Sequence, residues 1–412
     1  METLVVVLGA GASIKAGVPS TSCLTRVCRD ALPTFRSDGM TWTRGKLLPP
    51  SLTDSDDFAL TLDKELTRYF KAANSPRSYT FEDLLGLIEE LLGYVFGKPL
   101  VTSVTHILPP DSILKNNLML LSSLQNLLEA IHSSVGVASS SPVVQNSFAA
   151  AQIRRILEAL SKRYRLVVIN FNYDNIADDA NVEWHDGFVD SYENALLFSP
   201  RAWENQIDNK DAHLLVHLHG SVRFGLKPTS ALSVHGRFDE PAKYETYAEA
   251  ARTTTRSGSS TTVDGKVYPA SFIISGTNKG PKLGYNLRPY GYYQRALVEL
   301  VPHASRLLVM GYGWGDDHVN LFLKELVSLS GDLKSAVVGH RSGTEVNKNT
   351  PQNRYLMRLA GGSAWSRLEN WAYCPVVEPP TQTLWSDGHF MLLPCGFDLS
   401  IADEVALLNH LN

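Results

Sequence analysis

Cysteine and net charge are both scarce in this sequence of 412 residues. The four cysteines, Cys23, Cys28, Cys374 and Cys395, form no C-x-x-C pair, and a structural zinc site usually requires two such pairs. We therefore predict no bound metal. The net charge of −4 provides no basic field that would attract nucleic acid, so we expect no direct sequence-specific binding of nucleic acid.

Long hydrophobic runs are also absent. No apolar run reaches the roughly 18 residues needed to span a bilayer, and the N-terminal residues lack the pattern of a signal peptide. Unpaired cysteines are typical of a reducing compartment. Together these features predict a cytoplasmic protein with no membrane partner.

The sequence is rich instead in short apolar segments typical of strands, separated in several places by helical patterns. Such alternation predicts an α/β fold with a doubly wound parallel sheet of about six strands. The predicted strands cover residues 5–8, 165–170, 213–220, 271–278, 306–313 and 335–340.

Two regions differ from this pattern. Within residues 57–150, apolar residues recur at three- and four-residue spacing, which predicts a helical insertion in which Thr80 caps a helix. Residues 346–412 are irregular and contain Trp365, Trp371 and Trp385, and we predict that they form a C-terminal extension for packing or assembly. Residues 1–345 then form the domain that carries the site.

The first predicted strand runs into a glycine turn, GAGAS, at residues 9–13. Gly9 and Gly11 allow a sharp turn and close approach by a ligand, and the amides that open the next helix would face a pyrophosphate. The third glycine of the dinucleotide-binding fingerprint is replaced by Ile14. A purely structural turn between strand and helix is the alternative.

Polar residues also follow the other predicted strands. In a doubly wound sheet, ligands bind at the carboxyl ends of the strands. Five strands end in small or polar residues, and their agreement favours a site at this edge. Besides the first turn, these residues are Asn170, Asn172 and Asp174; His217, His219 and Ser221; Ser275, Thr277 and Asn278; and Gly311, Gly313, Asp316, Asp317 and His318.

Each of these residues also has a structural interpretation. Asn172 or Asp174 could cap a helix, and Asp316 could do the same before HVNLFLKELVSL. His219 could be a core histidine that bonds to backbone. His217 would share one face with His219 if the strand is regular, and we interpret His217 as structural.

Taken in order, these motifs resemble the sirtuin NAD-binding domain, and most closely its divergent bacterial branch found in antiphage defence proteins. The resemblance rests on GAGAS, AGVPS, NYD, HGS and the glycine turn of GYGWGDDHVN, with TFEDLL and SGTNKG as further motifs, over residues 1–345. It implies a sirtuin-like Rossmann sheet and NAD as the substrate.

By this resemblance Asn172 and Asp174 lie near the nicotinamide and its ribose, and His219 is the catalytic histidine. The other matched positions would bind the phosphates and the adenosine half of NAD: Gly9, Ala10, Gly11, Ser13, Thr277, Gly311, Gly313 and Asp316.

Two motifs of the deacylating sirtuins are missing from the sequence. Pro19 is followed by Ser20 instead of Asp-Phe-Arg, and there are no C-x-x-C pairs. The resemblance therefore implies hydrolysis of NAD⁺ to nicotinamide and ADP-ribose, which depletes NAD in abortive infection. It also implies a homo-oligomer, or a partner such as a HerA-type ATPase or another defence-system protein. NAD-dependent deacylation and non-catalytic sensing of NAD or ADP-ribose are the alternatives.

Overall fold

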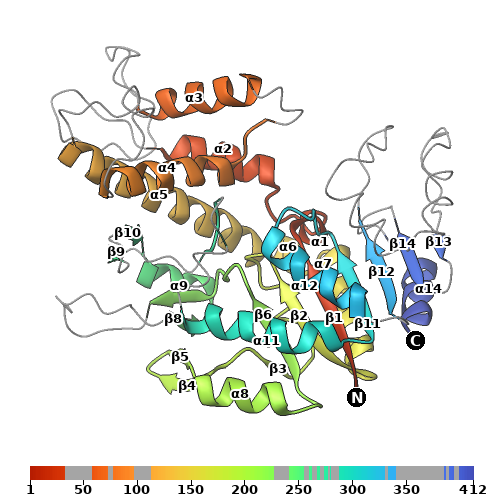
Figure 1. The fold of residues 1–412 in the computed structure, drawn as a ribbon. Helices are drawn as coiled ribbons and strands as arrows, with labels where there is room; N and C mark the ends of the chain where they lie inside the picture. Colours follow the sequence, from red (N-terminus) through yellow and green to blue (C-terminus); the bar gives the residue numbers. More distant parts are fainter. Residues whose placement is uncertain are drawn as a thin grey trace.

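A parallel sheet covered by helices forms the centre of the molecule, and further helices lie beyond one end of the sheet (Figure 1). The computed structural model describes residues 1–32, 58–72, 78–96, 113–226, 241–254, 259–261, 267–269, 273–276, 279, 287–329, 333–339, 385–386, 389–393 and 399–412.

Seven of the described strands run parallel in one sheet, and β13 pairs antiparallel at its edge. The prediction of an α/β fold with a parallel sheet is confirmed. In spatial order the strands are β13 (Trp385–Ser386), β14 (Phe390–Leu393), β12 (Lys334–Val338), β11 (Arg306–Met310), β1 (Glu2–Leu8), β2 (Tyr164–Asn170), β6 (His213–His217) and β3 (Trp184–His185).

Strand β1 illustrates why these segments form the sheet. It is apolar and fully buried over residues 4–8, as expected of a central parallel strand with helices on both faces. Neighbouring side chains such as Val6 and Val7 lie in opposite hydrophobic cores. Leu8 pairs with Asn170 of β2 and with Met310 of β11, so three strands end at the same level.

Helices cover both faces of the sheet. The core on one face includes residues of α7 (Phe148–Ser161) and α14 (Ile401–Leu411). The core on the other face includes residues of α8 (Pro200–Asp208), α11 (Tyr292–Leu300) and α12 (Asp317–Leu329). Within the described residues, every helix is too short or too polar for a membrane span.

Four more helices form what we call the helical layer: α2 (Thr21–Ala31), α3 (Phe58–Ala72), α4 (Phe81–Phe96) and α5 (Ile113–Ser139). Their apolar faces continue the core that lies beneath α7. Figure 1 shows the layer beyond the carboxyl ends of the central strands, where it faces the turn after β1. The last three of its helices lie in the region where the helical insertion was predicted.

The N-terminus of α4 is fixed by its own cap and by α2. Thr80 stands at the predicted cap position, and the Asp83 carboxylate accepts hydrogen bonds from its backbone N–H (2.7 Å) and its hydroxyl (2.9 Å). The Phe81 N–H donates to Thr25 Oγ1 of α2 at 3.0 Å. These contacts place the next residue, Glu82, toward the ends of the strands.

A second, antiparallel sheet of four strands was not predicted from the sequence. Its strands are short and scattered along the chain: β4 (Phe188–Tyr192), β5 (Ala195–Phe198), β8 (Pro241–Tyr244) and β7 (Phe224–Leu226). The remaining elements are α1 (Ala10–Ile14), α6 (Pro142–Gln145), α9 (Tyr247–Thr254), β9 (Ser259–Thr261), β10 (Val267–Pro269), the π-helix Leu287–Gly291 and the 3₁₀-helix Val301–His303.

Two predicted strands differ from the structure. The strand predicted over 213–220 ends at His217, because Gly220 adopts a left-handed conformation (φ +90°) and its N–H donates to His217 O in a turn. The strand predicted over 271–278 is wrong for residues 273–276, which form no strand. Ile274 instead donates its N–H to His219 O at 2.9 Å, so this segment runs beside the turn.

The C-terminal part of the chain contributes to the central sheet. Strand β14 pairs with β12, and α14 packs on the face of the sheet that α7 covers. Trp385 lies in β13, whereas Trp365 and Trp371 lie outside the described residues. Residues 390–393 and 401–411 thus pack in and against the sheet, while the role of residues 346–412 as an extension for packing or assembly stays a prediction.

Candidate active site

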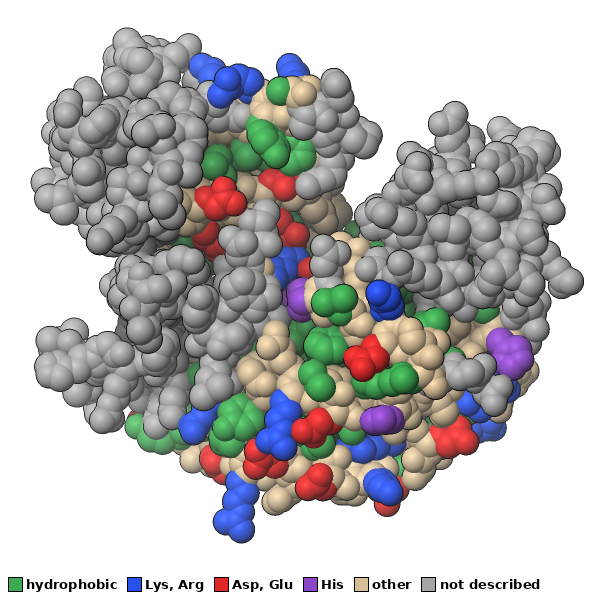
Figure 2. Space-filling model, viewed as in Figure 1, with side chains coloured by type: hydrophobic (Ala, Val, Ile, Leu, Met, Phe, Trp, Pro, Cys, Tyr) green, Lys and Arg blue, Asp and Glu red, His purple; other side chains and the backbone are tan. Residues whose placement is uncertain are grey.

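A cavity of about 920 Å³ lies at the carboxyl ends of β1, β2, β6 and β11, under the helical layer. Figure 2 shows acidic, basic and histidine side chains close together between the helical layer and the sheet. The volume falls within the roughly 300–1,000 Å³ typical of small-molecule sites. Of the residues to which the resemblance assigns a role, Thr277 lies outside the described residues and the other ten line this cavity: Gly9, Ala10, Gly11, Ser13, Asn172, Asp174, His219, Gly311, Gly313 and Asp316. Asn170, Ser221 and Ser275 also follow predicted strands but do not line it.

Close contacts between backbone atoms explain why three of the positions lining the cavity are glycine, without any ligand. The Gly9 N–H donates to Met310 O, and the Gly11 N–H donates to Gly311 O, each at 2.9 Å. A Cβ atom on Gly9 or Gly11 would lie only 2.6 or 2.8 Å from Gly311 O. Gly311 itself has φ +63°. The turns after β1 and β11 therefore interlock through backbone, and the Gly9 and Gly11 amides are already engaged.

The other positions of these two turns face open space. Ala10 is exposed, and as the first residue of α1 its N–H has no acceptor within the helix. Gly313 is also exposed, and a Cβ atom there would meet nothing within 4 Å among the described residues. Ala10, Gly313 and Gly315 are therefore exposed backbone positions of these turns on the cavity, while ligand contacts of Gly9, Gly11 and Gly311 stay a prediction.

Asn172 and Asp174 follow β2 and are tied to the turn after β1. The Asn172 amide donates to Ser13 Oγ at 2.9 Å, and its backbone N–H donates to Asn170 Oδ1 at 3.0 Å. Asp174 Oδ1 accepts from the Ile176 N–H at 3.1 Å. Asn172 Oδ1 and Asp174 Oδ2 are buried and have no hydrogen-bond partner among the described residues. Such atoms in a cavity wall are suited to bind a polar ligand.

Burial is the main influence on the pKa of Asp174. It raises the pKa of this carboxyl group above its ordinary value, although hydrogen bonds from Ser13 and Ile176 act in the opposite direction. Ser13 is itself only 2% exposed and contacts both Asn172 and Asp174. Ser13 is thus placed to orient these two side chains, and the phosphate contact implied by the resemblance stays a prediction.

His219 lines the cavity, whereas His217 does not. The His219 ring packs edge-on against Phe171, with ring centroids 4.9 Å apart, and its Nε2 lies 3.7 Å from Asp316 Oδ1. Because β6 ends at His217, the two histidines do not continue one regular strand. The His217 ring instead packs edge-on against Phe224 of the second sheet.

His217 belongs to a buried ionic cluster between the two sheets. Its Nε2 lies 3.1 Å from Asp178 Oδ2, and Lys243 of β8 bonds to Asp178 at 3.0 Å and also to Asp186. Burial alone would raise the pKa of Asp178, but the charges of His217 and Lys243 outweigh burial and lower it. The place of His217 in this buried cluster, away from the cavity, supports a structural role for it.

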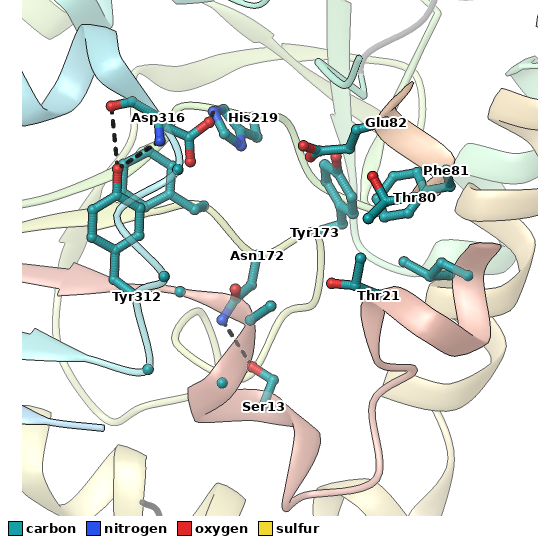
Figure 3. A pocket seen from close by; sticks show the side chains of 18 of the residues that line it. Ser13, Thr21, Thr80, Phe81, Glu82, Asn172, Tyr173, His219, Tyr312 and Asp316 are labelled. Carbon is teal, nitrogen blue, oxygen red and sulfur yellow. Dashed lines mark hydrogen bonds and ion pairs between the residues drawn. The ribbon is translucent and has the colours of Figure 1, made fainter. Parts of the chain in front are cut away.

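A second ionic cluster borders the cavity and was not predicted. Lys279 Nζ lies 2.7 Å from Glu82 Oε1 and 2.8 Å from Asp316 Oδ1. Burial alone would raise the pKa of Asp316, but nearby His219 and Lys279 outweigh burial and lower it. Figure 3 shows Asp316 beside His219 on one side of the cavity, with Glu82 on another and Asn172 between them and Ser13.

The sequence held a weak signal for these missed residues. Glu82 lies in TFEDLL and Lys279 in SGTNKG, two motifs of the resemblance, which assigns no role to either side chain. Tyr312 was also missed. Its hydroxyl accepts from the Asp316 N–H at 3.2 Å and bonds to Asn320 Oδ1 at 3.1 Å, which fixes the turn before α12.

The part of the chain that the structure describes brings together no group of three or more metal-binding side chains. Cys23 and Cys28 lie on α2, and burial raises the pKa of the Cys28 thiol to about 12. Cys374 and Cys395 lie outside the described residues. That the protein binds no zinc therefore stays a prediction, which metal analysis of the purified protein would test.

Part of the chain is similar to a known protein family. Residues 166–358 match the SIR2-like domain family. This segment begins in β2 and includes Asn172, Asp174, His219 and Asp316. Comparison with curated proteins gives no match.

Solved sirtuin structures show a loose similarity to the chain. A structure on the basis of sirtuin substrate affinity is 12% identical and covers 85% of each chain, with a TM-score of 0.33. Sir2Tm bound to a propionylated peptide is 11% identical and covers 91% of this chain and 94% of that chain, with a TM-score of 0.31. Sir2 with a peptide and NAD⁺ is 11% identical and covers 90% and 94%, with a TM-score of 0.29.

Proposed function

We propose that the protein hydrolyses NAD⁺ to nicotinamide and ADP-ribose. The match of residues 166–358 to the SIR2-like domain supports an NAD-utilising activity. The observation that carries the proposal is the meeting of Asn172, Asp174 and His219 in one cavity, at the ends of adjacent strands β2 and β6. A rigid sheet that presents such groups at its carboxyl edge is a common way to build a catalytic site.

The proposed reaction breaks the bond between C1′ of the ribose and the ring nitrogen of nicotinamide. Nicotinamide leaves as a neutral molecule with the bonding electron pair, the oxygen of water bonds to C1′, and one proton is released. The positive charge that develops on the ribose requires stabilisation and orientation by the site. The cavity supplies buried oxygens of Asn172 and Asp174 for this purpose, and His219 for transfer of the proton.

Asn172 has the geometry of a positioning group. Its amide nitrogen is occupied by Ser13, so its buried oxygen has a fixed direction and can accept a hydrogen bond from water or from a ribose hydroxyl. His219, only 3% exposed, would accept the proton of the attacking water or of a ribose hydroxyl. The place of Ala10, Gly313 and Asp316 around the same cavity supports NAD-binding roles for them.

One assay tests this proposal against its alternatives. Purified protein is incubated with NAD⁺, with and without an acylated peptide, and nicotinamide and ADP-ribose are quantified. Release of both products without peptide is the expected result. Nicotinamide release only with the acylated peptide would instead identify a deacylase, and binding of NAD⁺ or ADP-ribose without turnover would identify a sensing module.

The proposal extends to a cellular role. We propose depletion of NAD in antiphage defence, by a homo-oligomer or with a HerA-type ATPase or another defence protein as partner. This extension rests only on the resemblance of the sequence motifs to the bacterial defence branch. Cells that express the protein should lose NAD⁺ on phage infection, and cells that express the His219→Ala variant should not.

A further inference from the structure

Lys279 joins two parts of the molecule that meet at the cavity. It bonds to Glu82 of α4, in the helical layer, and to Asp316 in the turn between β11 and α12. The lysine side chain is only 11% exposed, so water screens these two ion pairs weakly. Lys279 is thereby held from two sides, by elements that are far apart in the sequence.

The same carboxylate oxygen of Asp316 faces both Lys279 and His219. Asp316 Oδ1 lies 2.8 Å from Lys279 Nζ, a normal length for a charge-assisted hydrogen bond. It lies 3.7 Å from His219 Nε2, which is too long for a hydrogen bond. Asp316 Oδ1 is thus hydrogen-bonded to the lysine, while the histidine lies at a longer distance from the same oxygen.

We propose that Lys279 is a positioning residue that binds the Asp316 carboxylate, weakens its pairing with His219, and so keeps the imidazole able to accept a proton. This proposal rests on the proposed function, in which His219 carries out that proton transfer. Without the ammonium group, the carboxylate would be attracted to an imidazolium and would favour the charged ring. A histidine held in that form is a poor proton acceptor at neutral pH.

Several groups surround His219 among the described residues. Each charged group among them favours or disfavours the charged imidazole, so its removal should change the pKa of His219. Asp316 favours the charged ring and Lys279 disfavours it. His318 of α12, with its ring centroid 5.8 Å from that of His219, disfavours it when protonated. Phe171 contributes an apolar ring edge and no charge. Glu82 pairs with Lys279, which in turn pairs with Asp316, and its negative charge favours the charged ring.

The direct test is a histidine side-chain NMR titration of the purified full chain. Lys279→Met should raise the pKa of His219 by about one unit, the lower end of the effect of a nearby charge. Asp316→Asn should lower this pKa, and the Lys279→Met/Asp316→Asn double variant should lie close to Asp316→Asn. Lys279→Arg, which keeps the charge, should restore most of the wild-type value.

A matched control is Lys162→Met, since Lys162 is an exposed lysine at the end of α7, outside the cavity. It should leave the pKa of His219 unchanged. An equal pKa in wild type and Lys279→Met would overturn the proposal. If Lys279→Met does not fold, Asp316→Asn decides the matter, because an unchanged pKa in that variant shows that Asp316 does not act on His219.

The pH dependence of turnover separates positioning from a merely structural role. The acid limb of kcat/KM for NAD⁺ should move to higher pH in Lys279→Met, with a loss that approaches about tenfold at pH values below the pKa of His219 and disappears by about pH 9, where the imidazole is neutral in both proteins. A loss of equal size at every pH contradicts the proposal. If wild type releases no nicotinamide, the proposed function fails, and the NMR titration still decides the role of Lys279.

Discussion

The side-chain amide of Asn172 donates a hydrogen bond of 2.9 Å to Ser13 Oγ, across 159 positions of the sequence. This bond joins the end of β2 to the turn after β1, and both residues are nearly inaccessible to water. It leaves the Asn172 oxygen directed by a neighbour in α1, the short helix that follows the adjacent strand β1. The orientation of the Asn172 side chain therefore depends on the relative placement of β2 and the turn after β1.

Removal of either proposed catalytic side chain should stop most turnover. Asn172→Ala and His219→Ala should each lower kcat for NAD⁺ by a factor of about 10² to 10⁴, as is typical for a lost positioning or proton-transfer group. Nicotinamide release measures the loss, and circular dichroism reports folding. His303→Ala, at an exposed histidine outside the cavity, is the control. Folded variants with near wild-type rates would show that the site is assigned to the wrong residues.

An added methyl group should have different effects at Gly311 and Gly313, two of the glycines that follow β11. Gly311→Ala should lower the free energy of unfolding by more than about 2 kcal/mol, because a Cβ atom would meet the turn after β1 at a left-handed position. Gly313→Ala should cost less than about 0.5 kcal/mol and should raise KM for NAD⁺ about tenfold, since its methyl group enters the cavity.

Gly339→Ala is the matched control for this pair. A Cβ atom there also meets nothing within 4 Å among the described residues, and Gly339 does not line the cavity. Urea unfolding and steady-state kinetics measure the two effects. A Gly313→Ala protein with unchanged KM would remove this turn from the proposed binding site.

His217→Ala should impair stability more than chemistry. The substitution leaves the buried Asp178 carboxylate with Lys243 alone, and breaking such a pair costs about 3 kcal/mol. Urea unfolding should show the loss, whereas kcat of the folded fraction should stay within about threefold of wild type. Loss of turnover in His217→Ala, together with an active His219→Ala, would reverse the roles assigned to the two histidines.

His132 predicts a pH dependence of stability. It lies buried on α5, its Nε2 is 3.0 Å from Val222 O, and burial lowers its pKa from 6.5 to about 4. The unfolded chain therefore binds more protons between these values, so stability decreases as pH falls from about 6.5 to about 4, by ~3 kcal/mol in total. His132→Gln should flatten this part of the stability profile, and His303→Gln should not. Parallel profiles for His132→Gln and wild type would contradict the assignment.

The central strands could be predicted because burial on both faces makes them apolar at consecutive positions. Once β1, β2, β6 and β11 are parallel, their carboxyl ends must meet, so the placing of Asn172 and His219 in one cavity follows from sequence pattern alone. β14 escaped prediction because its four residues lie in a segment without helical or strand periodicity.

The charged clusters could not be predicted, because each depends on tertiary placement. Nothing local connects Glu82 with Lys279, and their contact exists only because α4 docks over the strand ends. The turn at Gly220 likewise decides that His219 and His217 face different surroundings, although their spacing suggests a shared face. The sequence predicts a glycine turn at Gly9 and Gly11, and the structure adds a second reason for glycine there, the close approach of the neighbouring turn.

The position of β14 limits how the protein can be shortened. A fragment that ends before residue 390 would leave β12 as an edge strand, with a row of unpaired backbone groups that invites aggregation. It would also remove the Leu411 carbonyl, which accepts hydrogen bonds from Tyr164 (2.7 Å) and Arg306 (3.0 Å). A fragment confined to residues 166–358 would lack β1 and the helical layer as well as β14, so its inactivity would say nothing about the chemistry of the intact site.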